Sequence, residues 1–199
     1  MKNSLLIATH NDHKVEEIRA LLKASGLPIT DVRSLRDINF HQEIDENADT
    51  FAGNAWLKVR AIERVWQGDV LADDSGFEVE ALDGKPGVWS ARYAGEHGNH
   101  SANIAKVLDE MRSQLNRKGG FRTVLAGKWS GVEFEVEGTV HGHITREPIG
   151  WGGFGYDPIF IPDGNSRTFA DMSIEEKNLL SHRSIAFRNW ISWVRKFGM

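Results

Sequence analysis

Six consecutive residues near the N-terminus have the side chains of a phosphate-binding turn: Thr9, His10, Asn11, Asp12, His13 and Lys14. They stand between an apolar segment and a segment whose apolar residues recur at helical spacing. Backbone N–H groups in the first turn of a helix bind phosphate, and a lysine there can place its ammonium on the same anion. The pattern predicts a site for a phosphate tail. An ordinary capped strand-to-helix turn is the alternative, since no glycine-rich phosphate motif is present.

Two acidic clusters indicate metal chemistry, Glu43-Ile44-Asp45-Glu46 and Asp73-Asp74-Ser75-Gly76. Mg²⁺ takes a few carboxylates and otherwise keeps water and substrate phosphate oxygens. A carboxylate at such a site can also orient a water molecule. Adjacent aspartates repel each other unless a cation or donors offset the charge, which favours a functional role for the second cluster. For the first cluster, a solvated loop is the alternative.

The glycine-rich segment 150–158 has the composition of a base-binding loop, and it contains Phe154, Gly155, Tyr156 and Asp157. Glycines let backbone approach a ligand closely, aromatic rings can stack on a base, and a carboxylate can accept hydrogen bonds from a base edge. The segment therefore predicts a purine site. The alternative is a bend between strands, with both rings in the core.

Further donors stand near the C-terminus, where Lys177 is followed by Ser181-His182-Arg183. One helical turn and a break separate them, so they could reach one pocket and donate to phosphate or to a purine carbonyl. Alternatively, Lys177 is a solvated helix residue and His182 is a helix cap. The pair His141 and His143 lacks a third ligand and is not expected to bind metal.

The elements that position the first two sites follow from apolar spacing. A buried strand is expected over 5–9, followed by a helix with Asn11 or Asp12 as N-cap. A second helix should begin at Asp49 or Thr50 and extend to Trp66, and a short strand over 70–72 should end at the aspartates. We expect alternation to continue over 77–82, before a turn at 83–87.

The second half of the chain is expected to begin with a helix that extends to Leu115. The polar run 116–120 indicates a loop or hinge, and strands over 121–129 and 132–140 should form a hairpin through Ser130-Gly131. A capping box at 173–176 predicts a helix start, and a last helix carries Trp190. We expect Trp190 and Trp193 to be core or subunit contacts, and the run Glu133, Glu135 and Glu137 to be the solvent face of a strand.

Length and composition limit the class of protein. The 199 residues, 40% hydrophobic and 26% charged, indicate one folded unit, or two lobes that share one core. A net charge of -4 disfavours a nucleic acid polymer as partner. The absence of cysteine excludes disulfides and thiolate zinc sites, so any metal is bound by oxygen or imidazole. No apolar run reaches the roughly 18 to 20 residues of a membrane span, and we expect a cytoplasmic protein.

The order of strands and helices indicates an α/β or α+β fold. Taken together, the segments resemble the inosine triphosphate pyrophosphatase family over nearly the whole chain. The resemblance rests on Ala8-Thr9-His10-Asn11 with Lys14, Thr50-Phe51 with Asn54-Ala55, Ala72 to Gly76, Gly84 to Gly95, Gly153 to Phe160, and Glu175 to Asn178 with Ser181-His182-Arg183.

This resemblance implies an α/β fold over residues 1–199 as a single domain. The fold would be elongated and two-lobed, with a long mixed sheet flanked by helices and a central substrate cleft, and the protein would be a homodimer. It implies Mg²⁺-dependent hydrolysis of the deaminated purine nucleotides ITP, dITP and XTP to the monophosphate and pyrophosphate, which cleanses the nucleotide pool.

The resemblance also assigns roles to residues. Asp74 matches the family's catalytic acid-base residue and metal ligand, and residues 9–14 match the triphosphate loop. Asp45 stands where relatives carry a metal-binding glutamate, so the metal role there could fall to Glu43 or Glu46 instead. Substrate contacts fall on Ser75, Phe154, Gly155, Tyr156, Asp157, Lys177, His182 and Arg183, and Trp89 replaces a usual tyrosine.

We therefore expect Lys14 to bind the phosphate tail while Asp74, with or without Asp73, orients the attacking water. Donors among Lys177, His182 and Arg183 should select the purine 6-keto group over the adenine amino group. A pyrophosphatase for pyrimidine or other modified nucleotides, and a non-catalytic nucleotide sensor, are the alternatives.

Overall fold

A computed structural model describes residues 4–197, and the chain divides into two compact units. Unit 1 comprises Met1–Asp74, Thr123–Gly138 and Ser184–Met199, and unit 2 comprises Ser75–Arg122 and Thr139–Arg183. Each unit has its own hydrophobic cluster. The boundary between Asp74 and Ser75 falls within the second acidic cluster of the sequence.

The first three strands form the parallel part of a mixed sheet. Strand β1 (Ser4–Ile7) pairs in parallel with β2 (Asp31–Ser34) and with β3 (Asp69–Val79). Parallel neighbours require crossover connections, which here contain α1 (Asp12–Ser25) and α2 (Phe51–Ile62). The loop after β1 therefore leads directly into α1, as the sequence predicts.

Two long antiparallel strands complete the centre of the sheet. They are β5 (Lys118–Trp129) and β6 (Val132–Ile144), joined through Ser130 and Gly131. Both linking residues have positive φ, 50° and 82°, which matches the twist of a tight hairpin. The strand order is β2-β1-β3-β5-β6-β7, with β4 (Pro86–Gly87) paired with β3.

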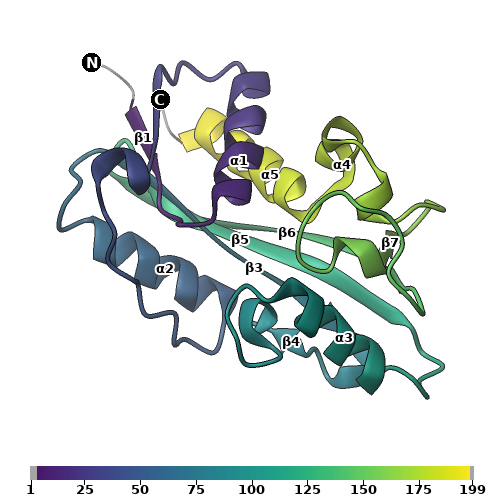
Figure 1. The fold of residues 1–199 in the computed structure, drawn as a ribbon. Helices are drawn as coiled ribbons and strands as arrows, with labels where there is room; N and C mark the ends of the chain where they lie inside the picture. The colour runs from purple at the N-terminus through teal and green to yellow at the C-terminus, as the bar shows by residue number, and fades with distance from the viewer. Residues whose placement is uncertain (1–3, 198–199) are drawn as a thin grey trace. The chain divides into compact units, whose positions relative to one another are not determined.

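In unit 1, helices cover both faces of the sheet. Figure 1 shows α1 beside α5 (His182–Phe197) on one face and α2 on the other. The cluster beneath α1 and α5 joins Ile18 and Leu22 to Phe187 and Trp190. On the other face, α2 buries the predicted stripe of Phe51, Ala55, Val59 and Ile62.

Unit 2 has an aromatic core. Phe77, Phe121 and Phe160 pack at ring centroid distances of 4.8 to 5.9 Å, and Phe169 and Tyr156 join them. Around this core lie α3 (His100–Glu110), α4 (Ile174–Leu180) and β7 (Phe160–Pro162). Residues 4–197 also contain five short 3-10 helices: η1 (Arg36–Ile38), η2 (Glu80–Leu82), η3 (Ser90–Arg92), η4 (Asp157–Ile159) and η5 (Phe169–Asp171).

Side-chain caps begin the helices where the sequence indicates. Asn11 caps α1, Thr50 caps α2, and Ser173 and Glu176 form the predicted capping box of α4. Each cap oxygen accepts a hydrogen bond from a backbone N–H that lacks an intrahelical partner. The cap at Asn11 positions the loop 9–14 at the first turn of α1.

Several predicted boundaries are wrong. Helix α2 ends at Ile62, and Trp66 turns back so that its indole N–H donates to the carbonyl of Asp69. Helix α3 ends at Glu110, which leaves Leu115 92% exposed. The run 116–120 is partly strand, since β5 begins at Lys118. Residues 73–76 lie inside the continuous strand β3 and not after its end.

The predicted α/β fold with a mixed sheet flanked by helices is confirmed. The elongated two-lobed form, the central cleft and the single-domain organisation stay predictions. No helix within residues 4–197 is long and apolar enough to cross a membrane.

Candidate active site

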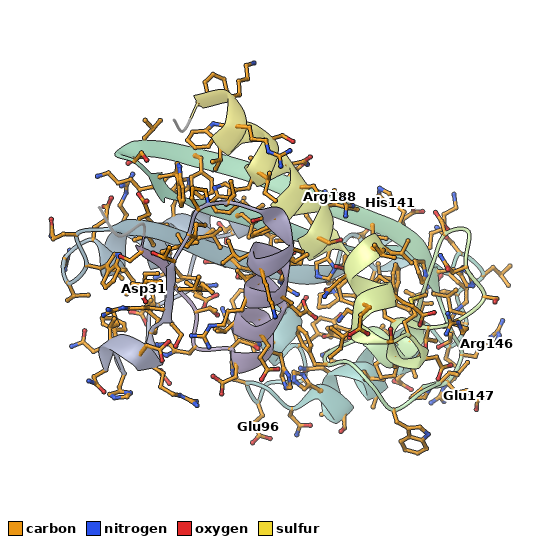
Figure 2. The ribbon with its side chains drawn as sticks, turned by 90° about the horizontal axis from the view of Figure 1, so that it is seen from above. Asp31, Glu96, His141, Arg146, Glu147 and Arg188 are labelled. Carbon is orange, nitrogen blue, oxygen red and sulfur yellow. The ribbon has the colours of Figure 1, made fainter. Side chains whose placement is uncertain are left out.

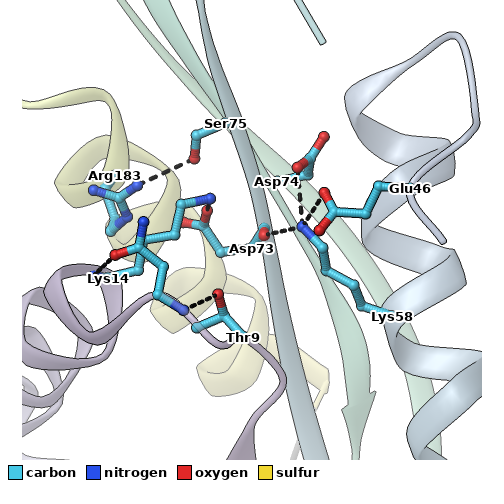
Figure 3. Close-up of polar contacts among 9 residues, drawn as sticks. Thr9, Lys14, Glu46, Lys58, Asp73, Asp74, Ser75 and Arg183 are labelled. Carbon is cyan, nitrogen blue, oxygen red and sulfur yellow. Dashed lines mark hydrogen bonds and ion pairs between the residues drawn. The ribbon is translucent and has the colours of Figure 1, made fainter. Parts of the chain in front are cut away.

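Asp73 and Asp74 are adjacent in β3, so their side chains leave opposite faces of the strand (Figure 3). Each carboxylate meets its own lysine. Lys14 Nζ lies 2.5 Å from Asp73 Oδ1, and Lys58 Nζ lies 3.0 Å from Asp74 Oδ1. The repulsion expected of neighbouring aspartates is therefore offset by two cations from two different helices.

The loop 9–14 contributes Lys14 to this arrangement. Thr9 is buried, and its hydroxyl accepts a hydrogen bond from the backbone N–H of Asn11 at 3.2 Å. Asn11 Oδ1 in turn accepts from the backbone N–H of Lys14 at 3.2 Å. These contacts fix the first turn of α1 and place the lysine side chain against Asp73.

The remaining side chains of the loop are exposed and turn elsewhere. His10 Nε2 lies 3.0 Å from the carbonyl of Gln42, and Asp12 forms an exposed ion pair with Arg36. His13 is also exposed. Of the six residues predicted for the tail site, Lys14 contacts Asp73, and Thr9 and Asn11 hold the turn that carries it. The substrate roles of all six stay predictions.

Lys58 is a buried cation that sequence reasoning missed. Its ammonium lies 2.8 Å from Glu46 Oε2 and 3.0 Å from both Asp74 Oδ1 and the carbonyl of Asp73 (Figure 3). A detectable signal exists in the sequence, because Lys58 falls on the apolar stripe of α2, one turn after Asn54. A lysine at such a position indicates a buried partner of opposite charge.

The charges of this cluster perturb one another. Burial opposes ionisation of Lys58, yet the carboxylates of Asp74 and Glu46 outweigh burial and raise its pKa. Burial disfavours the charged form of Glu46 as well, but the adjacent ammonium of Lys58 outweighs burial and lowers the pKa of Glu46. The pKa of Asp74 is raised, first by burial and then by the charge of Glu46, against the opposing effect of both lysines.

The first acidic cluster contributes Glu46 to this arrangement. Glu46, and not Asp45, contacts the ammonium that Asp74 also contacts, while the side chain of Asp45 is exposed. Glu46 was one of the alternatives to Asp45. The metal role of Asp45 stays a prediction without geometric support from this structure.

The pair Glu46 and Asp74 suits Mg²⁺. Two carboxylates already converge on one cation, the Lys58 ammonium, so the electrostatic potential at this position favours cations. No group of three or more His, Cys, Asp or Glu with metal-binding geometry occurs within residues 4–197. Mg²⁺ commonly uses one or two protein carboxylates with water and phosphate oxygens, so two suffice.

In unit 2, the Ser-His-Arg segment is buried. Arg183 is 1% exposed, and its Nη2 donates a hydrogen bond to the hydroxyl of Ser75 at 3.2 Å. His182 is 4% exposed, and its ring stacks on Phe121 with centroids 4.8 Å apart. Ser75 and Arg183, both predicted substrate contacts, therefore lie together.

The glycine-rich loop is held by Asp157. Its Oδ2 accepts hydrogen bonds from Lys177 Nζ at 2.7 Å and from the backbone N–H of Phe154 at 2.8 Å. Lys177 is therefore a buried, paired cation and not a solvated helix residue. Its ammonium also lies 4.8 Å from the centre of the Phe154 ring.

The two aromatic residues of this loop differ in environment. Tyr156 is buried in the aromatic core, and its hydroxyl donates to the carbonyl of Ser90 at 2.9 Å. This matches the structural alternative for Tyr156, whose substrate role stays a prediction. The Phe154 ring is partly exposed and lies within 6 Å of Lys177 and Arg183, so it is the ring available for stacking.

The segment Gly84 to Gly95, which carries part of the resemblance, is structural in unit 2. The Ser90 hydroxyl bonds to the backbone of Phe77 and Gly87, and Asn103 bonds to the backbone of Ala94 and Ala91. These contacts tie β3, β4 and α3 together. Trp89 is 53% exposed.

His141 and His143 are exposed as well, and neither belongs to a metal-binding group among the described residues.

Comparison with known proteins identifies the family. The model of the Ham1 family matches residues 5–193. A dITP/XTP pyrophosphatase of Bacillus subtilis is 45% identical over 186 residues, which cover 92% of each chain, and one of Christiangramia forsetii is 41% identical over 192 residues, which cover 96% of this chain and 99% of the other.

Solved structures give the same result. The Staphylococcus aureus Ham1 protein has a TM-score of 0.85 at 33% identity, over 97% of this chain and 98% of the other. A nucleoside-triphosphatase, or dITP/XTP pyrophosphatase, of Mycobacterium abscessus has a TM-score of 0.74 at 38% identity, over 94% and 97% of the two chains. With a family model spanning nearly its whole length and relatives this similar, the chain belongs to the Ham1 family.

Proposed function

We propose that this chain is a nucleoside triphosphate pyrophosphatase that hydrolyses ITP, dITP and XTP to the monophosphate and pyrophosphate with Mg²⁺. The single observation that carries the proposal is the pairing of Asp73 and Asp74 with Lys14 and Lys58 on opposite faces of β3. Relatives over 40% identical have the name dITP/XTP pyrophosphatase, which supports the same enzyme class.

The groups proposed for the triphosphate belong to the loop 9–14 and to the carboxylates around Lys58. Lys14 and the first turn of α1 bind the phosphate tail, with Asp73 holding the lysine in place before substrate arrives. Glu46 and Asp74 would hold Mg²⁺, which neutralises phosphate charge when bound. The ammonium of Lys58 holds both carboxylates in position.

Asp74 also acts on the attacking water in this proposal. Its carboxylate accepts a proton from water as the water oxygen bonds to the α-phosphorus. The bond from the α-phosphorus to the bridging oxygen breaks, and pyrophosphate leaves with the electron pair. Positioning and electrostatics supply most of the catalysis, as in phosphoryl transfer generally.

The groups proposed for the base belong to the glycine-rich loop and to the buried donors Lys177, His182 and Arg183. The Phe154 ring stacks on the purine, while donors from Lys177, His182 and Arg183 bind the 6-keto oxygen. Adenine presents an amino group at that position and would leave a buried donor unpaired, so ATP is rejected. Gly155 keeps the backbone beside Phe154 free of a side chain.

The decisive experiment is pyrophosphate release from ITP, dITP, XTP, GTP and ATP, with and without Mg²⁺, by the wild type and by Asp74→Asn. We expect ITP, dITP and XTP to be hydrolysed much faster than ATP, and only with Mg²⁺. Asp74→Asn should abolish turnover and keep the circular dichroism spectrum. Comparable rates on ATP and ITP would refute the base selection, and full activity of Asp74→Asn would refute the mechanism.

The same assay separates the alternatives. A sensor would bind ITP without releasing pyrophosphate, and a pyrimidine enzyme would prefer pyrimidine triphosphates in an extended panel. The homodimer, the cytoplasmic location and the absence of a nucleic acid partner stay predictions. Sedimentation equilibrium tests the homodimer directly.

A further inference from the structure

A pocket of about 450 Å³ lies in unit 2, and none of the residues assigned to substrate or metal lines it. Its volume falls within the range of small-molecule sites. The wall from α3 is partly apolar, and the remaining wall is cationic. The lining residues are Ala105, Leu108, Asp109, Arg112, Arg117 and Arg146.

Arg117 is held in one orientation by the backbone. Its Nε donates to the carbonyl of Ile144 at 2.9 Å, its Nη1 donates to the carbonyl of Met111 at 2.9 Å, and its Nη2 donates to the carbonyl of Thr145. A guanidinium carries five N–H donors, so the remaining N–H groups of Arg117 can donate to a ligand. Fixing the side chain in advance reduces the entropy lost when a ligand binds.

The positive charge of the pocket is not balanced. Three guanidinium groups and one carboxylate line it, although the whole chain has a net charge of -4. Asp109 pairs with Arg112 at 2.6 Å. Within residues 4–197, no carboxylate forms an ion pair with Arg117 or Arg146.

Arg146 increases this imbalance. It is exposed on the loop after β6 (Figure 2), and the neighbouring Glu147 is not among the lining residues. Burial and then the charge of Arg146 lower the pKa of Arg117, as expected where two like charges line one pocket. A bound anion would relieve that repulsion.

We propose that this pocket is a second anion site, specific for a small molecule that carries phosphate groups. Arginine forks match phosphate oxygens in pairs, and three of them around one cavity favour a multiply charged group over a single carboxylate. Either an inorganic polyphosphate or an organic phosphate has this chemistry, and Leu108 and Ala105 offer an apolar wall to the organic part of the second. The proposal does not depend on the proposed catalytic activity.

Binding should be measured by isothermal titration calorimetry without Mg²⁺, with inorganic pyrophosphate as the probe. Lys14→Gln serves as the background, because it removes the cation of the proposed tail site. In that background, Arg146→Glu should weaken binding by about tenfold or more, since one charge-assisted hydrogen bond is replaced by a repulsion. Arg64→Glu, an equal charge reversal on the exposed surface of unit 1, should not change it.

Equal affinity in Lys14→Gln with and without Arg146→Glu would overturn the proposal, as would an absence of binding in Lys14→Gln. A second measurement needs no variant: the Arg117 Nε–Hε signal of ¹⁵N-labelled wild type should shift on titration. An unmoved signal at saturating pyrophosphate would also overturn the proposal. Titration with inosine monophosphate distinguishes the two kinds of ligand. If inosine monophosphate binds more tightly than pyrophosphate, the ligand is an organic phosphate, and if it binds more weakly, the ligand is an inorganic one.

Discussion

Lys58 is the residue on which the acidic cluster depends. Replacing it by methionine leaves the carboxylates of Glu46 and Asp74 close together without their ammonium. Removing one partner of a buried ion pair costs about 3–5 kcal/mol, because the remaining charge is not compensated. We therefore expect Lys58→Met to lower the free energy of unfolding in urea by that amount.

Arg60 provides the matched control on the same helix. It pairs with Glu63 and Glu133 on the exposed face of α2, where an ion pair contributes about 1 kcal/mol or less. Arg60→Met should therefore change the free energy of unfolding far less. Equal losses in the two variants would show that Lys58 acts only through helix packing.

Mg²⁺ should compensate for the loss of Lys58. In Lys58→Met the two carboxylates lack a cation, so Mg²⁺ binds the folded state more favourably and raises the unfolding temperature. We expect a larger increase in Lys58→Met than in the wild type, measured by calorimetry at constant ionic strength. If Mg²⁺ does not raise the unfolding temperature of Lys58→Met, Glu46 and Asp74 do not form the metal site.

At the level of elements, the glycine-rich loop depends on two glycines with similar backbone conformations. Gly153 and Gly155 have φ of 70° and 62°. A Cβ on Gly153 would lie 2.1 Å from Asp157 Oδ2, whereas one on Gly155 would meet nothing within 4 Å. Gly153→Ala should therefore displace Asp157 and, with it, Lys177.

Gly155→Ala is the control for backbone strain alone. It should cost roughly 1 kcal/mol of folding free energy, which is the usual penalty of an L residue in the left-handed region. Gly153→Ala should cost more and reduce the ratio of kcat/KM for ITP over ATP. Equal selectivity in the two variants would show that Asp157 does not position the base-binding donors.

The turn after β2 gives the chain a pH-dependent contribution to stability. Asp37 accepts hydrogen bonds from the backbone N–H and hydroxyl of Ser34, and from Arg19. These bonds favour the carboxylate and lower the pKa of Asp37 below its ordinary 3.8. A lowered pKa in the folded state means that stability is present above pH 3.8 and lost as the pH falls below it.

Asp37→Asn removes this dependence. The difference in free energy of unfolding between wild type and variant should be constant above the ordinary pKa and shrink as the pH falls further, as measured by urea titrations. A difference that does not change with pH would show that Asp37 contributes no charge-dependent stability.

On the scale of the whole molecule, two cores are connected by continuous strands. β3, β5 and β6 each run through both units, so loss of one core removes support from strands that belong to the other. Phe187→Ala in unit 1 and Phe160→Ala in unit 2 should each cost about 3–5 kcal/mol. We expect either change to reduce hydrogen-exchange protection in β1 and in α3 alike. If Phe160→Ala affects only α3, the units unfold independently.

The sequence by itself determined the local structure and the kinds of side chain available for chemistry. Caps at Asn11, Thr50 and Ser173, the apolar stripe of α2 and the hairpin at Ser130-Gly131 all depend on residues close together in the chain, and such interactions are visible in a sequence. The family assignment rests equally on local segments. The predicted boundaries at Trp66 and Leu115 are wrong. The Trp66 indole donates to the carbonyl of Asp69, and Arg117 donates to the carbonyl of Met111 just after α3, and apolar spacing does not predict such side-chain-to-backbone contacts.

Only the tertiary structure decided which charges meet. In the structure Asp73 pairs with Lys14, while Asp74 and Glu46 both pair with Lys58. Lys177 is buried and pairs with Asp157, and three arginines line one pocket. Ion pairs between residues far apart in the chain depend on which faces of strands and helices pack together, and periodicity alone does not specify those contacts.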